Sequence, residues 1–275
     1  MNMTNTYLIK KIIIPTFITA AFAFTLCGCV DISNREFIPE ITSQEEENAG
    51  VGGILLITDT ESETDELTQS MPSRPENVTE LSFSPEQQSF IDSCLFMGDS
   101  ICSGLGANGL VESCYAKAGV AARNIEEFTF EHGGAQVEPL TAIVNSGKKN
   151  LVFIMGMNDV NIENPEEFTV YYDSFLSRVE ALCPDASLYV LSITPVTEDS
   201  SFCYNYEIDG FNDVLKDMIT NSSSAARHFV DISVSLKNAD GNLMPEYTAA
   251  ADGVHLVKAA YYDILYSLCE GAGVR

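Results

Sequence analysis

A serine stands at a position where its hydroxyl can act as a nucleophile. Ser100 follows Gly98 and Asp99 directly after the apolar run 94–97. A hydroxyl at the tip of a strand can begin the next helix, where its oxygen faces solvent and free backbone N–H groups can bind an anion. Gly-Asp-Ser is also a common turn or helix cap. The motif therefore indicates acyl-transfer chemistry only if the other parts of a catalytic site accompany it.

The other parts are present further along the chain. Asp252 and His255 stand three residues apart, just before the amphipathic segment 261–268. A carboxylate at this spacing in a loop can accept a hydrogen bond from imidazole Nδ1, which turns Nε2 toward a nucleophile. Asn158, after the apolar run 151–155, offers an amide to a developing oxyanion. A nucleophile, a base, a residue that orients the base and an oxyanion donor are then all available.

The elements that must position these residues alternate between strand and helix patterns. Short apolar runs predict buried parallel strands, and large apolar residues at helical spacing lie between them. The predicted strands are 94–97, 113–117, 151–155, 188–194 and 228–232, and the predicted helical segments are 168–182, 211–219 and 261–268. This alternation predicts an α/β fold, a three-layer α/β/α sandwich over residues 88–275. Ligands of open parallel sheets bind beyond the carboxyl ends of the strands, where Ser100 and Asn158 are expected.

Four short blocks resemble those of the SGNH, or GDSL-like, hydrolases, a family of flavodoxin-like α/β/α esterases and lipases. Residues 98–101, Gly-Asp-Ser-Ile, resemble the first block, with Ile in place of the usual Leu. Residues 156–159, Gly-Met-Asn-Asp, and residues 252–255, Asp-Gly-Val-His, are close matches to the asparagine and histidine blocks. Gly119, after the second predicted strand, is a looser match to the glycine block. The resemblance covers essentially the whole globular part.

The resemblance implies a parallel five-stranded sheet and a serine esterase that needs no cofactor and no metal. Ser100 is the expected nucleophile, His255 the general base and acid, and Asp252 the residue that orients the imidazole. The N–H groups of Ser100 and Gly119 and the amide of Asn158 are the expected oxyanion donors. The expected substrate is a small-molecule or glycan ester with a short acyl chain, acetyl above all, and a carbohydrate as its alcohol.

Two alternatives stay open within the same fold, and a third fails. The same residues can transfer the acyl group to a cell-surface glycan, or the domain can be a non-catalytic surface-binding module. The pattern Gly-x-Gly-x-x-Gly at 104–109 resembles a dinucleotide-binding loop. Such a loop follows its strand directly and opens a helix, whereas six residues intervene here and a strand-like run comes next.

The N-terminal 28 residues have the pattern of a lipoprotein signal peptide. Lys10 and Lys11 precede the apolar run 12–26, which is short for a membrane span and typical of a signal-peptide core. The run ends in Leu-Cys-Gly-Cys at 26–29, which resembles the bacterial lipobox with Cys29 as the lipid-bearing residue. An ordinary signal peptide is the alternative. The lipobox predicts an exported protein, anchored to the outer face of the bacterial cell membrane.

Residues 29–87 are rich in Glu, Asp, Ser, Thr and Asn, and bury too little apolar surface to offset their ordering entropy. We predict a mostly disordered tether, in which the run 54–58 is either a short edge strand or an isolated apolar stretch. The whole chain has 14 Lys and Arg against 40 Asp and Glu, for a formal net charge of −26. Such acidity argues against a nucleic-acid partner, since binding a phosphate backbone requires clustered basic residues. The oligomeric state is left open.

Six cysteines lie beyond the N-terminal pair, at positions 94, 102, 114, 183, 203 and 269. An even number in an exported chain suggests disulfides. Several of them, however, stand inside apolar runs, and free cysteine is among the most buried residue types. We therefore expect scattered core thiols. The sequence has no C-x-x-C pair and its three histidines are far apart, which argues against a zinc site.

Overall fold

The computed structural model describes residues 82–248 and 250–275. The predicted signal peptide, Cys29 and the apolar run 54–58 lie outside the described residues. The described part begins shortly before helix α1 (Pro85–Ser93), which starts within the segment that the sequence assigns to the tether.

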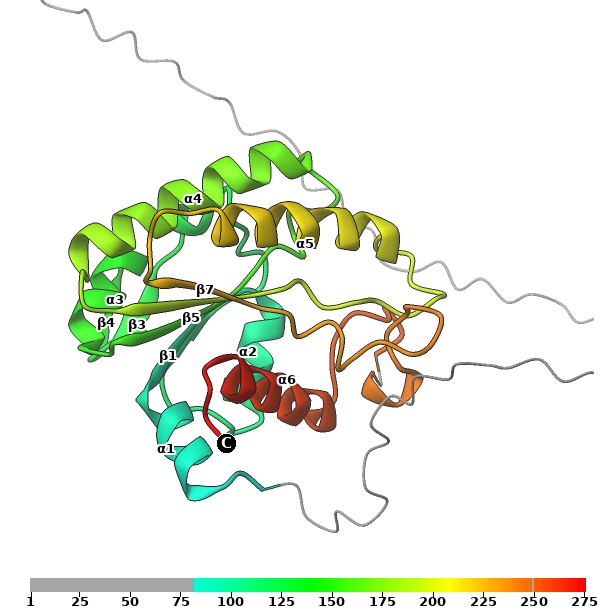
Figure 1. The fold of residues 1–275 in the computed structure, drawn as a ribbon, viewed down its shortest axis with the longest axis horizontal. Helices are drawn as coiled ribbons and strands as arrows, with labels where there is room; N and C mark the ends of the chain where they lie inside the picture. Colours follow the sequence, from blue (N-terminus) through cyan, green and yellow to red (C-terminus); the bar gives the residue numbers. More distant parts are fainter. Residues whose placement is uncertain (1–81, 249) are drawn as a thin grey trace, which may run out of the picture. The chain divides into compact units, whose positions relative to one another are not determined.

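Five parallel strands form the central sheet in the order β2-β1-β5-β6-β7 (Figure 1). The strands are β1 (Cys94–Gly98), β2 (Cys114–Ala116), β5 (Asn150–Ile154), β6 (Ser187–Leu191) and β7 (Arg227–Val230). Among these five strands the order is the flavodoxin-like 2-1-3-4-5. All five predicted strands are confirmed. The fourth ends earlier than predicted, because the Ile193 N–H donates to the Asn212 side chain at 2.7 Å and leaves the ladder.

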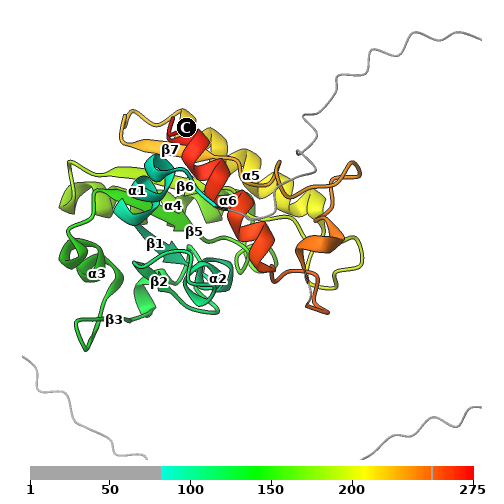
Figure 2. The ribbon, with the colours of Figure 1, turned by 90° about the horizontal axis from the view of Figure 1, so that it is seen from below.

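Helices cover both faces of the sheet, as Figures 1 and 2 show. On one face lie α1, α2 (Ser100–Ala107) and α6 (Lys258–Gly271). On the other lie α4 (Pro165–Leu182) and α5 (Asn205–Thr220), with α3 (Pro139–Ser146) beside α4. The fold is therefore the predicted three-layer α/β/α sandwich. Within the described residues, no helix combines the length and the apolar character that crossing a membrane requires.

Shorter elements complete the described part of the chain and were not predicted from the sequence. They are the antiparallel hairpin of β3 (Phe130–His132) and β4 (Ala135–Val137), and the 3₁₀ turns η1 (Ile125–Glu127) and η2 (Pro245–Tyr247). Helices α1 and α3 also escaped prediction. Helices of eight or nine residues have fewer than three turns and strands of three residues have one alternation, which is too short for a periodic signal.

The core lies between the sheet and both helix layers. In β1 and β5 the central residues Leu95, Phe96, Val152 and Phe153 are completely buried. Parallel strands covered on both faces must be apolar throughout, which is why these runs lack polar alternation. All six cysteines of the described part are free thiols, and four of them are buried. This agrees with the expectation of scattered core thiols.

Gly98 ends β1 at its closest approach to β5. A Cβ at Gly98 would lie 1.7 Å from the backbone oxygen of Ile154, and that oxygen also accepts the Asp99 N–H at 3.0 Å. We expect Gly98→Ala to lower the free energy of unfolding by at least about 3 kcal/mol, because no side-chain rotation relieves a clash with backbone. Urea unfolding followed by circular dichroism measures the change.

Gly210→Ala is the matched control. Gly210 lies inside α5, and a Cβ there meets no atom within 4 Å. This variant should match the wild type or gain up to about 1 kcal/mol, since alanine is the better helix former. Equal losses in both variants would contradict the role assigned to the Gly98 contact.

Candidate active site

Ser100 is the first residue of α2, at the carboxyl end of β1. Asp99 caps this helix: its Oδ1 accepts the N–H of Ile101 at 2.9 Å and that of Cys102 at 3.4 Å. The cap fixes the first turn, so that Ser100 stands where a helix has no intrahelical acceptors for its N–H groups. The Gly-Asp-Ser sequence thus caps the helix and also places an accessible hydroxyl at its first residue.

The fold brings the predicted nucleophile, base and orienting carboxylate into one hydrogen-bonded chain. Nε2 of His255 lies 3.1 Å from Oγ of Ser100, although the two residues are 155 positions apart. Nδ1 of His255 lies 2.7 Å from Oδ2 of Asp252. With its proton on Nδ1, the imidazole can accept the serine proton at Nε2. The His255 and Asp252 side chains are 50% and 45% exposed, which leaves the chain open to a substrate.

A tight turn explains why Asp252 and His255 are three residues apart. Oδ1 of Asp252 accepts the N–H of Val254 at 2.9 Å and that of His255 at 3.2 Å, while Oδ2 faces the imidazole. These interactions lower the pKa of Asp252 to about 2, and the Val254 N–H is the largest cause. A carboxylate with so low a pKa stays ionised near neutrality, where it can stabilise a neighbouring imidazolium.

The predicted oxyanion donors stand at the ends of three adjacent strands. Ser100 follows β1, Gly119 follows β2 and Asn158 follows β5, and β1 lies between the other two. The Asn158 side chain donates to the Val120 carbonyl at 2.9 Å, which uses one of its two amide hydrogens. Gly119 is exposed and has a φ of +84°, a backbone conformation that favours glycine. The structure therefore places Asn158 against the Gly119–Val120 segment.

An ion pair with a buried carboxylate holds this segment in place. Asp159 is completely buried and accepts the Ala122 N–H at 2.8 Å and the Arg123 guanidinium at 3.1 Å. The same guanidinium donates to the Asn158 carbonyl at 2.6 Å. Burial raises the pKa of Asp159, and these hydrogen bonds oppose the rise. The sequence analysis includes Asp159 in the block 156–159 but misses Arg123, which is 36 positions away and in no motif.

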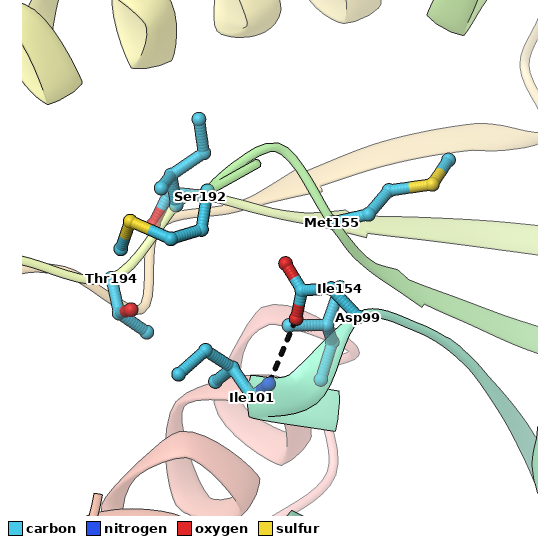
Figure 3. A pocket seen from close by; sticks show the side chains of 8 residues that line it. Asp99, Ile101, Ile154, Met155, Ser192 and Thr194 are labelled. Atoms are coloured by element: carbon cyan, nitrogen blue, oxygen red, sulfur yellow. Dashed lines mark hydrogen bonds between the residues drawn. The ribbon is translucent and has the colours of Figure 1, made fainter. Parts of the chain in front are cut away.

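A small cavity lies beside the first turn of α2 (Figure 3). Its walls include Asp99 and Ile101, the two neighbours of Ser100 in the chain, and Met157, the neighbour of Asn158. It leaves about 10 Å³ for the centre of a water-sized group, about what one water molecule requires. Asp99 is 1% exposed, and its burial raises the pKa of the carboxyl to about 7. The dashed line in Figure 3 marks its bond to the Ile101 N–H.

Comparisons with known proteins yield likeness in structure only. No family model matches the sequence, and no curated protein matches it. A Streptococcus pneumonia protein whose name refers to platelet activating factor has a similar structure, with a TM-score of 0.53 and 20% identity over 67% of this chain and 90% of that chain. This likeness shows a shared fold.

Two further solved structures are similar at lower scores. An acetylxylan esterase from Geobacillus stearothermophilus has a TM-score of 0.49 and 17% identity over 67% of this chain and 98% of that chain. A GDSL-like lipase from Bacteroides thetaiotaomicron has a TM-score of 0.48 and 16% identity over 66% and 87% of the two chains.

Asp99 should give the protein a distinctive pH-dependent stability. Its folded pKa of about 7 exceeds the ordinary value of about 3.9, so its contribution to stability is full below about pH 4 and is lost as pH rises through about 7. An asparagine at this position would keep the cap without titrating. We therefore expect Asp99→Asn to become more stable relative to wild type between pH 5 and pH 8, measured by urea unfolding.

The exposed Asp92 supplies a control for this measurement. The free energy of unfolding of Asp92→Asn should match that of the wild type at pH 5 and at pH 8. If Asp99→Asn does the same, the carboxyl of Asp99 is ionised at little cost in the folded protein, and the assigned effect of burial is wrong.

Proposed function

We propose that this protein is a serine esterase that hydrolyses short-chain esters through an acyl-enzyme. One observation carries the proposal: Ser100, His255 and Asp252 form a continuous hydrogen-bonded chain, with distances of 3.1 Å and 2.7 Å. This is the arrangement that activates a serine hydroxyl in hydrolases of unrelated folds. The sequence blocks that resemble those of SGNH hydrolases support the same conclusion.

The reaction begins with attack on the ester. Oγ of Ser100 bonds to the carbonyl carbon while Nε2 of His255 takes its proton, and the carbonyl oxygen becomes an oxyanion. Asp252 stabilises the imidazolium that forms. When the tetrahedral intermediate collapses, the bond to the alcohol oxygen breaks and His255 returns the proton to that oxygen. The acyl group is then an ester of Ser100.

Water completes the cycle by the same steps. His255 removes a proton from the water as its oxygen attacks the acyl carbon, and a second oxyanion forms. Collapse of this intermediate breaks the bond to Oγ, and His255 protonates the serine. The acid is released. The oxyanion of each half-reaction is held by the N–H groups of Ser100 and Gly119 and by the second amide hydrogen of Asn158.

The cavity lined by Asp99 and Ile101, the two neighbours of Ser100, supports a short acyl chain. Its space of about 10 Å³ suits a group the size of one water molecule, and the methyl of an acetyl group is about that size. Ile101 and Met157 are among the residues that line it. We propose an acetyl ester as the preferred substrate, with a carbohydrate as its alcohol.

Hydrolysis of 4-nitrophenyl acetate tests the mechanism. Ser100→Ala should lose all enzymatic turnover, because no other group forms the acyl-enzyme. Asn158→Ala should lower kcat by about 10²–10³ with little change in folding, since one oxyanion donor is lost. Activity that survives in Ser100→Ala would rule out this mechanism.

A series of nitrophenyl esters tests the acyl preference. We expect kcat/KM of the wild type to fall steeply from acetate to butyrate and octanoate, because the cavity accepts little beyond a methyl group. Met157→Ala should flatten this decline by enlarging the cavity. A wild type that prefers octanoate would defeat the acetyl proposal without affecting the catalytic one.

We propose in addition that Cys29 carries a lipid that anchors the exported protein to the outer face of the cell membrane. The support is the lipobox-like sequence at 26–29, which lies outside the described residues. Acyl chains hold a protein at a membrane by about 0.8 kcal/mol for each buried methylene.

Metabolic labelling with a fatty-acid analogue tests the anchor. The bacterially expressed wild type should be labelled and Cys29→Ala should not. Cys27→Ala serves as the control and should keep the label, because only the second cysteine is the predicted acceptor. Label that persists in Cys29→Ala would exclude this site.

A further inference from the structure

Three aromatic side chains are exposed on and just after the segment that joins β6 to α5. Phe202 is 38% exposed, Tyr204 62% and Tyr206 72%. The two tyrosine rings stack nearly parallel, with centroids 5.5 Å apart and planes 12° apart. We call these three residues the aromatic patch. Exposed apolar groups that gather in one place commonly mark a binding surface.

The backbone beneath the aromatic patch is held by hydrogen bonds. The Tyr204 N–H donates to the Glu207 carboxylate at 2.9 Å, and the Glu207 N–H donates back to the Tyr204 carbonyl at 3.0 Å. The Phe202 carbonyl accepts from the Asn161 amide at 2.5 Å. The rings are therefore presented from an ordered frame, which reduces the entropy that a ligand must overcome on binding.

The segment that carries the patch touches both loops of the candidate active site. The Ser200 hydroxyl donates to the Asp252 carbonyl at 2.8 Å, and the Thr197 N–H donates to the Gly253 carbonyl at 3.0 Å. On the other side, Asn161 belongs to the loop that contains Asn158 and bonds to Phe202. A substrate larger than its acyl group, bound at Ser100, can therefore reach this segment.

The charge around the patch selects among the possible ligands. Residues 197–209 contain the carboxylates Glu198, Asp199, Glu207 and Asp209 and neither Lys nor Arg. Asp209 forms an ion pair with Lys237, so Glu198, Asp199 and Glu207 carry the charge of this segment. These carboxylates repel anionic lipid surfaces and anionic glycans, whereas the hydroxyl groups of a neutral sugar can donate hydrogen bonds to them. The apolar C–H face of a sugar ring fits the flat face of a tyrosine, whose own hydroxyl stays in contact with water.

We propose that the aromatic patch binds the sugar rings of a neutral acetylated glycan and presents its ester to Ser100. This inference rests on the proposed esterase function and names the part of the protein that recognises the alcohol. The small cavity binds the acyl group of the ester, and the aromatic patch binds the sugar that carries it.

Binding to a chain that cannot turn over tests the patch directly. The dissociation constant for acetylated xylo-oligosaccharides is measured by calorimetry in the full-length Ser100→Ala chain. It is then measured in double variants that combine Ser100→Ala with Tyr204→Ala, Tyr206→Ala or Tyr206→Phe. We expect each alanine variant to raise Kd by about 10-fold, the order expected for the loss of a ring contact. Tyr206→Phe should stay near the starting value, since it keeps the ring. Tyr171→Ala, an exposed tyrosine on α4, is the control and should also leave Kd unchanged.

A kinetic comparison with active chains gives a second readout. The ratio of kcat/KM for the acetylated oligosaccharide to that for 4-nitrophenyl acetate should fall about 10-fold in Tyr206→Ala, mainly through KM, and stay constant in Tyr171→Ala. An equal loss on both substrates would indicate damage to the catalytic residues and overturn the proposal.

The remaining outcomes also decide the question. If Kd is the same in all tyrosine variants, the patch does not bind sugar. In the Cys29→Ala background, loss of binding to phosphatidylcholine vesicles in Tyr206→Ala, with sugar Kd unchanged, would make the patch a lipid contact and overturn the proposal. A wild type inactive on every ester would refute the esterase function instead, and the binding comparison in Ser100→Ala would still give its own result.

Discussion

The hydrogen bond between Ser100 and His255 is the interaction on which the candidate site depends. It joins residues 155 positions apart across 3.1 Å, so it exists only while the helix that begins at Ser100 and the loop after η2 keep their places at one edge of the sheet. Several local contacts hold the two residues at hydrogen-bonding distance. The Asp99 cap orients the first turn of α2, the close approach at Gly98 seats that turn against β5, and the turn at Asp252 aims the imidazole.

Two aspartates near the serine illustrate how the environment decides what a carboxyl group does. Asp252 is half exposed and accepts backbone N–H groups, which lower its pKa to about 2. Asp99 also accepts backbone N–H groups, yet its burial outweighs them and raises its pKa to about 7. The first is suited to stabilising a positive imidazole, whereas the second is suited to capping a helix inside the core. Their chemical identity is the same, and solvent access separates their roles.

The two sides of the candidate site differ in size and character. Beside the first turn of α2, a cavity whose lining includes Ile101 and Met157 has little more space than a methyl group needs. On the side of the loops, the segment through Ser200 and Phe202 opens onto exposed aromatic rings and carboxylates. An ester with a small acid and a large neutral alcohol matches both sides, and this links the proposed acyl preference to the proposed sugar surface. The segment that joins β6 to α5 connects the active-site loop to the sugar surface, because it hydrogen-bonds to the Asp252 loop and carries the aromatic patch.

The amino-acid sequence by itself determined the fold class, the five strands and the three longest helices, because apolar periodicity and strand-end turns are local properties of the chain. It also singled out Ser100, Asn158, Asp252 and His255, since their short blocks carry recognisable spacing. Tertiary structure alone decided that these blocks meet, that Arg123 secures the Asn158 loop and that Ser200 ties the aromatic patch to the Asp252 loop. The same holds for the two opposite pKa shifts. Contacts between distant segments and burial depend on how the whole chain packs, and no local pattern of residues encodes them.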